Sequence, residues 1–370
     1  MPTAEAPSTE FIQILVNLIR GDRESAVYQL RSSHASADEF LRFAAANGLS
    51  VVVLRALENA TLRAMFLPSA IELLEKRAQE RADRSLRLLR ELDRIAEIFA
   101  AAGQRFMLLK GPYLAKRFYG DSQGREYSDL DLLVPAQERA RVFRLFANAG
   151  YARRSRVLLG TRLTCYFVHA FDFTRDKSVI DLHWSICRHP SFRIDEARMW
   201  AQRQEYELDG RRYNVLSDEY EVNFAILSML RDIERSSFKI KKLIDLLRIV
   251  DALDPHLDWD AFFEERRRDG ALGASVNVLG LCLELAGGET FYPRLRATLA
   301  RHVHRRIPSR PALSPFVFAP ASFGIGNKLW CVEVYESSRA GSLLWWGASL
   351  PFRLAVHRHI RRLNRHAGPA

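Results

Sequence analysis

Several patterns that identify common protein classes are missing from this sequence. Its 370 residues include only four cysteines, which are widely separated and form neither a CxxC pair nor the Cys/His spacing of a zinc site: Cys165, Cys187, Cys282 and Cys331. No apolar run approaches the roughly 20 residues of a membrane-spanning helix, and the first residues lack the basic start and apolar core of a signal peptide. These absences argue against a disulfide scaffold, a zinc finger and an integral membrane protein. We expect reduced thiols in a cytoplasmic protein.

Lysine is also scarce relative to arginine, and we find no internal repeat, low-complexity tract or RNA-binding motif. The formal net charge is nevertheless +11. Such a charge favours acidic partners: nucleic acid, nucleotides or an anionic membrane surface. A genome-wide bias towards arginine codons explains the same charge without any partner. The charge therefore permits an RNA acceptor and does not establish one.

The hydrophobic pattern divides the chain into three regions. Residues 1–102 are helical after a polar start, and the clearest helix is expected over 69–102, where apolar residues recur every three or four positions. Residues 217–370 are helical again, with Ser217 as an N-cap before acidic residues and further helices over 240–253 and 271–285. Between them, residues 103–216 form an α/β unit.

The central region alternates between short strand and helix patterns. Strands are expected over 105–109, 129–134, 163–173 and 178–186, and helices over 112–119 and 136–149. A polar loop covers 121–128. Residues 205–215 predict a hairpin with an Asp209-Gly210 turn.

The most informative feature is a pair of carboxylates, Asp129 and Asp131, inside an otherwise apolar strand pattern. Alternation along a strand sends both to one face. Two like charges on a half-buried strand repel each other and lose hydration, and a bound divalent cation removes that penalty. Hard cations such as Mg²⁺ take oxygen ligands and commonly hold substrate phosphates as well. The pair therefore suggests a metal–phosphate enzyme, although a DxD pair of solvated turn acids is the simple alternative.

Two other segments could complete such a site. Lys110-Gly111 lies where a strand meets a helix, so Gly111 would allow close backbone approach, the helix amides would favour a phosphate, and Lys110 would add positive charge. Asp181 and His183 share one face of a later strand. A third carboxylate can complete a metal site and take up the proton of a nucleophile, as two-metal phosphoryl transfer requires.

Each of these residues also has an ordinary structural interpretation. Lys110 could be a surface lysine, Asp181 could pair with an arginine, and His183 could orient a neighbour or pack in the sheet. Arg125 could anchor phosphates or pair with Asp129 or Glu126.

Taken together, the motifs resemble the uncharacterised nucleotidyltransferase family of the DNA-polymerase-β-like superfamily. They are Leu108-Leu109-Lys110-Gly111, Leu114-Ala115, Tyr119, Arg125, Ser128-Asp129-Leu130-Asp131-Leu132-Leu133-Val134, Asp181-Leu182-His183-Trp184 and Lys242-Leu243-Ile244-Asp245-Leu246-Leu247. The likeness extends from about residue 86 to 250. In the wider superfamily a Gly-Ser pair opens the motif, whereas this chain has Lys110-Gly111 and a longer separation from Gly111 to Asp129.

The resemblance implies an α+β fold: a small mixed β-sheet with helices, flanked by N- and C-terminal helical regions. It implies that Asp129, Asp131 and Asp181 are catalytic residues and ligands of two Mg²⁺ ions, with Mn²⁺ as the alternative cation. Lys110, Gly111 and Arg125 would bind the nucleoside triphosphate, and Ser128 and His183 would support the metal ligands.

The expected reaction moves a nucleoside monophosphate, AMP from ATP, to a hydroxyl or phosphate of an unknown small molecule, peptide or RNA, and it releases pyrophosphate. Two alternatives are a non-catalytic nucleotide-binding or scaffold protein with the same fold and an RNA-directed transferase. The aromatic and basic segment 343–366 could contact a membrane surface or a protein, or could simply pack on the helical region.

Overall fold

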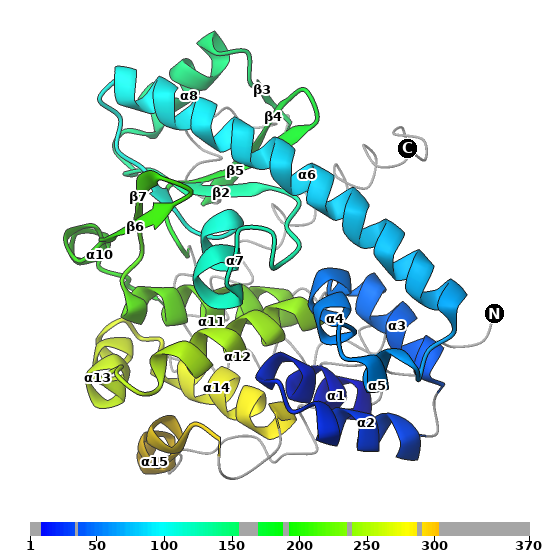
Figure 1. The fold of residues 1–370 in the computed structure, drawn as a ribbon. Helices are drawn as coiled ribbons and strands as arrows, with labels where there is room; N and C mark the ends of the chain where they lie inside the picture. Colours follow the sequence, from blue (N-terminus) through cyan, green and yellow to red (C-terminus); the bar gives the residue numbers. More distant parts are fainter. Residues whose placement is uncertain are drawn as a thin grey trace.

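A computed structural model describes residues 9–33, 36–154, 169–187, 192–234, 239–286 and 291–302. A β-sheet lies between two layers of helices (Figure 1). The long helix α6 (Pro68–Ala101) and α8 (Arg139–Asn148) cover its upper face in this view. Below the sheet lie the short helix α7 (Pro112–Tyr119) and then α11 (Asp218–Glu234) and α12 (Ile240–Leu253). The expected α+β architecture is confirmed.

The sheet has five strands in the order β1-β2-β5-β4-β3, with the bounds Met107–Leu108, Leu130–Leu133, Ser178–His183, Ala170–Arg175 and Ala152–Arg153 in that order. The two central strands, β2 and β5, are parallel. The other neighbouring pairs are antiparallel, so the sheet is mixed, as the family resemblance implied.

Alternation along the strands gives the sheet two chemically different faces. Leu132 and Leu182 are fully buried in the main core, to which α6 and α8 also contribute. On the same face the ring of Phe143 from α8 contacts Phe171 and Trp184. The opposite face carries Asp131, Asp181 and His183 and turns towards α11. The sheet thus presents its polar face to the helices below it.

The two flanking helical regions pack on each other below the sheet. The N-terminal region contains α1 (Thr9–Arg20), α2 (Arg23–Ser32), α3 (Ala37–Ala46), α4 (Ser50–Ala56) and α5 (Ala60–Arg63). The C-terminal region adds α13 (Trp259–Arg268), α14 (Leu272–Ala286) and α15 (Pro293–His302) to α11 and α12. Helix α1 contacts both α12 and α14, and Arg248 of α12 donates a hydrogen bond to the carbonyl of Ile19 over 3.0 Å.

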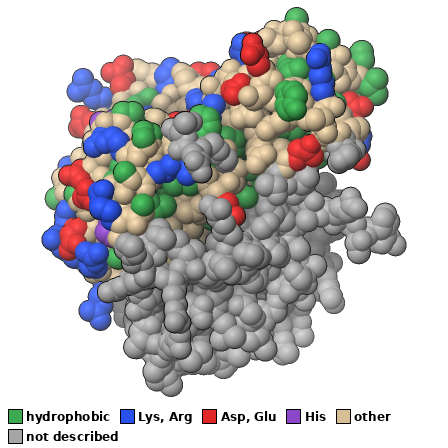
Figure 2. All heavy atoms as spheres, turned by 90° about the horizontal axis from the view of Figure 1, so that it is seen from below, with side chains coloured by type: hydrophobic (Ala, Val, Ile, Leu, Met, Phe, Trp, Pro, Cys, Tyr) green, Lys and Arg blue, Asp and Glu red, His purple; other side chains and the backbone are tan. Residues whose placement is uncertain are grey.

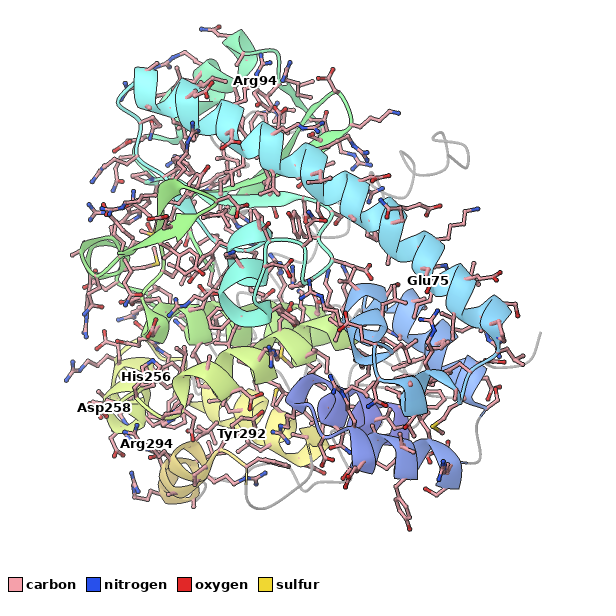
Figure 3. The ribbon with its side chains drawn as sticks, viewed as in Figure 1. Glu75, Arg94, His256, Asp258, Tyr292 and Arg294 are labelled. Carbon is pink, nitrogen blue, oxygen red and sulfur yellow. The ribbon has the colours of Figure 1, made fainter. Side chains whose placement is uncertain are left out.

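Side-chain contacts fix the outer helices to this layer. Arg294, at the start of α15, donates to the carbonyl of Asp254 over 3.2 Å, and His256 lies 3.3 Å from the Asp218 carboxylate of α11 (Figure 3). Glu75 and Arg94 mark the lower and upper parts of α6 in the same view. One helix therefore spans from the N-terminal helices to the sheet.

Most sequence-predicted elements are present, with shifted ends. Helices α7 and α12 have the predicted bounds, and α6 and α14 differ from theirs by one residue. The predicted hairpin forms as β6 (Gln204–Leu208) and β7 (Arg211–Val215) around the Asp209-Gly210 turn.

Two predicted elements have different bounds, and Ser217 stands at its predicted N-cap position without a side-chain hydrogen bond to any described residue. The strand predicted over 163–173 is β4, which runs from Ala170 to Arg175, and the start of the predicted range lies outside the described residues. Helix α8 begins at Arg139, because Glu138 instead closes a turn onto the carbonyl of Pro135. The Ser217 hydroxyl has no hydrogen-bond partner among the described residues, so only its backbone carbonyl, which accepts from Glu221, begins α11. Helix α10 (Glu196–Ala201) had no sequence prediction.

The structure bears on only some of the broader expectations. Of the helices that it describes, none combines the length and apolarity required for a transmembrane span. Cys282 is a buried free thiol, whereas Cys165, Cys331 and the segments 306–324 and 343–366 lie outside the described residues. On the described part of the underside, basic and acidic side chains are interspersed (Figure 2).

Candidate active site

Strands β2 and β5 bring the predicted carboxylates together. Asp131 and Asp181 are direct partners in the parallel register and therefore lie side by side on the polar face. Their side chains are 14% and 23% exposed, so both are largely withdrawn from water while still open to a ligand. Ligand atoms of Asp131, Asp181 and His183 all lie within 4.8 Å of one another. Among the described residues, these three form the group that could hold a metal ion.

His183 lies between the two carboxylates. Its Nε2 is 3.2 Å from Asp131 Oδ1 and 3.1 Å from Asp181 Oδ2, and its side chain is 1% exposed. Burial disfavours the charged ring, but the Asp181 and Asp131 carboxylates outweigh burial and raise the pKa of His183 to about 9. The role assigned to His183 from its sequence position, an orienting contact to a metal ligand, thus has a geometric basis.

Asp129 precedes β2 and stands next to this group. Burial first, and then repulsion from Asp131 and Asp181, raise the pKa of Asp129 to about 6. Asp131 behaves in the opposite way: burial works against its charge, but Lys110 and His183 outweigh burial and hold its pKa below the usual range. Ser128 is exposed, and its hydroxyl is 3.4 Å from the Asp129 carboxylate, so its support of that group is weak.

Gly111 sets the position of α7 beside Asp129. Its φ of 67° and ψ of −126° belong to a region that only glycine occupies without strain. A Cβ at Gly111 would lie 3.5 Å from the carbonyl oxygen of Asp129. Helix α7 begins at Pro112, where a missing N–H costs nothing. The strand–glycine–helix junction therefore places the start of α7 beside the backbone of Asp129.

Lys110 is turned towards α11. Its ammonium donates to Ser228 Oγ over 3.1 Å and lies 4.3 Å from the centre of the Phe224 ring. Lys110 also lowers the pKa of both Asp129 and Asp131. Within the described part of the chain, no carboxylate lies within 4.0 Å of this ammonium, which leaves its charge available to an anion.

Helices α11 and α12 contribute cations that the sequence analysis did not assign to the site. Lys241 donates to the carbonyl of Glu126 over 3.0 Å and lowers the pKa of Asp129. Arg231 lies 2.8 Å from a ring nitrogen of His169 and lowers the pKa of Asp131. Neither makes an ion pair with a carboxylate among the described residues. Burial first, and then repulsion from Arg125, lower the pKa of Lys241 to about 8.

Lys242 differs from these cations because it is already paired. Its ammonium lies 2.7 Å from Asp232 and donates to the Ser228 carbonyl over 3.0 Å. Burial first, and then repulsion from Lys110, lower the pKa of Lys242 to about 7. Lys242 thus lies close to Lys110, but its own charge is already paired with Asp232.

Arg125 has a different environment from the one expected. Its guanidinium makes two bonds to Asp245 of α12, of 2.5 and 2.6 Å, and both side chains are 7% exposed. Tyr119 also donates to this carboxylate over 2.8 Å. Asp129 and Glu126 were the partners suggested by the sequence, but the carboxylate that Arg125 binds lies 120 residues further along the chain.

The next residue, Glu126, connects the same loop to the N-terminal helices. Its carboxylate accepts from the amide of Ser50 over 2.6 Å, at the start of α4, and lies 3.5 Å from Arg81 of α6. Two consecutive buried charges, Arg125 and Glu126, therefore fix the loop before Asp129 to the two flanking helical regions. This arrangement explains how distant helices can control the position of the carboxylates.

A further carboxylate, Asp172, had no sequence prediction. It faces Asp181 in the antiparallel register of β4 and β5. Burial and then Asp181 raise its pKa. The residues Asp131, Asp181 and Asp172 thus form a row across three adjacent strands. The Ala-Phe-Asp-Phe alternation of β4 was the available signal, but it does not reveal which strand is the neighbour.

Comparisons with known proteins agree with the sequence motifs. The family model described as "Uncharacterised nucleotidyltransferase" matches residues 33–287. No curated protein matches the sequence.

Two solved structures are similar to limited extents. The lincosamide antibiotic adenylyltransferase LnuA, in its lincomycin-bound crystal structure, is 17% identical, with 36% of this chain and 84% of that chain covered and a TM-score of 0.27. An antigenic nucleotidyltransferase-like protein from Paracoccidioides brasiliensis is 15% identical, with 60% and 88% covered and a TM-score of 0.31. At TM-scores this low, neither similarity bears on the fold or function of this chain.

The family match is of a different kind, because it spans most of the chain. It includes both carboxylate strands, the Lys110-Gly111 junction and the cationic helices α11 and α12. This protein belongs to the uncharacterised nucleotidyltransferase family.

Proposed function

We propose that this protein transfers a nucleoside monophosphate, AMP from ATP, to a hydroxyl or phosphate of an acceptor and releases pyrophosphate. The observation that carries this proposal is the opposition of charges across the site. Asp129, Asp131 and Asp181 lie on the sheet side. Three cations without an ion pair among the described residues, Lys110, Arg231 and Lys241, act on these carboxylates from the β1–α7 junction and the helices below. A metal–triphosphate complex has the complementary charges.

The chemistry of the donors supports divalent cations at the carboxylates. Asp131 and Asp181 supply oxygens beside each other. Burial first, and then repulsion from these two carboxylates, raise the pKa of Asp129, and a bound cation would offset both penalties. We propose these three residues as the ligands of Mg²⁺. When bound, such ions lower the pKa of an attacking hydroxyl and neutralise charge on the triphosphate and pyrophosphate.

The chain's own residues then have distinct tasks. The acceptor oxygen attacks the α-phosphorus, a new P–O bond forms, and the bond from the α-phosphorus to the pyrophosphate oxygen breaks. Asp181 takes the proton of the acceptor. Lys110, Lys241 and Arg231 neutralise the triphosphate and the charge that develops on the leaving pyrophosphate. Gly111 and the first amides of α7 allow a phosphate to approach closely.

In the proposed mechanism Arg125 does not bind phosphate. Both edges of its guanidinium are occupied by Asp245 and Glu126, and the pair is buried. We propose instead that Arg125 positions the loop that leads to Asp129.

Conservative variants test the proposal. Full-length protein is incubated with Mg²⁺, [α-³²P]ATP and separated small-molecule, peptide and RNA fractions of a host lysate, and pyrophosphate and transferred label are measured. We expect Asp131→Asn and Asp181→Asn each to lose at least about 100-fold in rate, since each removes charge stabilisation or proton transfer worth about that factor. The control is Asp176→Asn, an exposed aspartate in the turn between β4 and β5. Equal rates in wild type, Asp131→Asn and Asp181→Asn would refute this mechanism.

A further inference from the structure

The position of the His183 imidazole within the carboxylate group is more specific than an orienting role requires. Its Nε2 is almost equidistant from an oxygen of Asp131 and an oxygen of Asp181, at 3.2 and 3.1 Å. A histidine that orients one carboxylate needs only one such contact. Here a single nitrogen points between two carboxylates from adjacent strands.

These separations equal those between neighbouring ligands of one metal ion. Donor atoms about 2.1–2.2 Å from an ion and at right angles to each other lie about 3.0–3.1 Å apart. Both Nε2–oxygen distances in the structure fall close to this value. The two distances from Nε2 therefore suit neighbouring ligand positions on one ion, which would take the place of the proton that Nε2 holds towards the carboxylates.

The surroundings hold the imidazole in this position. The His183 side chain is 1% exposed, and the centroid of its ring lies 5.6 Å from that of His169 and 6.3 Å from that of Phe224 in α11. Its carbonyl accepts from the amide of Val134 over 2.9 Å, which fixes β5 to the end of β2. A preorganised nitrogen donor of this kind loses little entropy when it binds a metal.

We propose that Nε2 of His183 is a metal ligand, so that the cation between Asp131 and Asp181 has a mixed nitrogen and oxygen ligand set. Imidazole nitrogen suits transition cations, whereas Mg²⁺ favours oxygen ligands and water. The site consequently binds Mn²⁺ more tightly than Mg²⁺. This inference deepens the proposed function, on which it rests for the presence of a cation at these carboxylates.

Pulsed electron paramagnetic resonance with Mn²⁺ as the only added metal tests the assignment without turnover. We expect the full-length wild type to show hyperfine coupling to one histidine ¹⁴N, and the coupling to vanish in His183→Gln. In His169→Gln, the matched control for a neighbouring imidazole outside the ligand group, the coupling should remain. A wild-type spectrum without nitrogen coupling, or coupling that persists in His183→Gln, would overturn the proposal.

A competition titration supplies a second readout. The His183→Gln change should weaken Mn²⁺ binding at least about tenfold but change Mg²⁺ binding less than about threefold, since the removed donor is one that Mg²⁺ does not favour. Equal loss for both ions would assign His183 to the support of the carboxylates instead. Because both measurements concern binding alone, nitrogen coupling in a protein that transfers no nucleotide would refute the proposed function and leave the ligand assignment standing.

Discussion

The buried pair between Arg125 and Asp245 yields the sharpest prediction about the positioning of the site. In the Asp245→Asn variant, Arg125 keeps its charge in a place where its side chain is only 7% exposed, but it loses its counter-charge. The change also weakens the acceptor for the Tyr119 hydroxyl. Burial alone would raise the pKa of Asp245, yet Arg125 holds it below the ordinary value, which shows that the ionised pair is the favoured state.

The expected cost follows from the asymmetry of such pairs. Removal of one partner of a buried ion pair destabilises a protein by about 3–5 kcal/mol, whereas replacement of both by apolar residues is often close to neutral. Since a domain is stable by only about 5–15 kcal/mol, Asp245→Asn should visibly lower the midpoint of urea unfolding. The double variant Arg125→Met/Asp245→Leu should recover most of that loss.

The same double variant separates two roles for Arg125. If Arg125 only positions the loop before Asp129, the refolded double variant should bind ATP within about threefold of wild type. If Arg125 binds phosphate, loss of its charged hydrogen bonds, about 1.5–3 kcal/mol each, should weaken ATP binding by about tenfold or more. A loss below about 1 kcal/mol in Asp245→Asn, or weak ATP binding in a stable double variant, would refute our assignment.

Three further predictions concern charges around the site. Lys241→Met should raise KM for ATP about tenfold or more, because a charge-assisted phosphate contact is lost. Lys239→Met, a change at an exposed lysine, should leave KM unchanged. Equal KM values for wild type and Lys241→Met would exclude Lys241 from the site. Burial raises the pKa of Glu221 from 4.5 to about 7, so this group contributes stability that is present below pH 4.5 and lost as the pH rises through 7. Glu221→Gln should therefore stabilise the protein at pH 8 by up to about 3 kcal/mol but not at pH 4.5, and an equal shift in Tm at both pH values would contradict this. The pKa of Asp129 is also raised, so its ionised form destabilises the folded protein at pH 8. Asp129→Asn should therefore raise the Tm of metal-free protein at pH 8 and reduce the Tm gain on addition of Mg²⁺. A lower Tm of the metal-free variant would contradict this destabilisation.

Local sequence signals predicted the parts of the fold that local energetics determine. Helix α7 has its predicted bounds because Pro112 favours the first helical position and Gly120 adopts the left-handed conformation at the end. The Asp209-Gly210 dipeptide likewise fixed the β6–β7 turn, where both residues have positive φ. The ends of β4 and α8 were less predictable, since strand pairing and a turn at Pro135 decide them.

The candidate site was likewise predictable from the sequence only in part. Alternation along a strand was sufficient to predict that Asp131 faces the same side as Asp129, and that Asp181 faces the same side as His183. It could not predict that these two strands are adjacent and parallel, which is what brings the carboxylates together. The cations Arg231 and Lys241 escaped notice because a charged residue on an amphipathic helix ordinarily faces water, and only the packing of α11 and α12 under the sheet turns them towards the carboxylates.

The central claim is transfer of a nucleotidyl group, and the fate of two labels tests it most directly. Parallel reactions of the full-length protein with Mg²⁺ and the acceptor-containing lysate fraction receive either [α-³²P]ATP or [γ-³²P]ATP. We expect the α label to enter the acceptor and the γ label to leave as pyrophosphate, with both signals lost in Asp131→Asn. Transfer of the γ label to the acceptor would reveal a phosphoryl transfer of another kind and would refute nucleotidyl transfer.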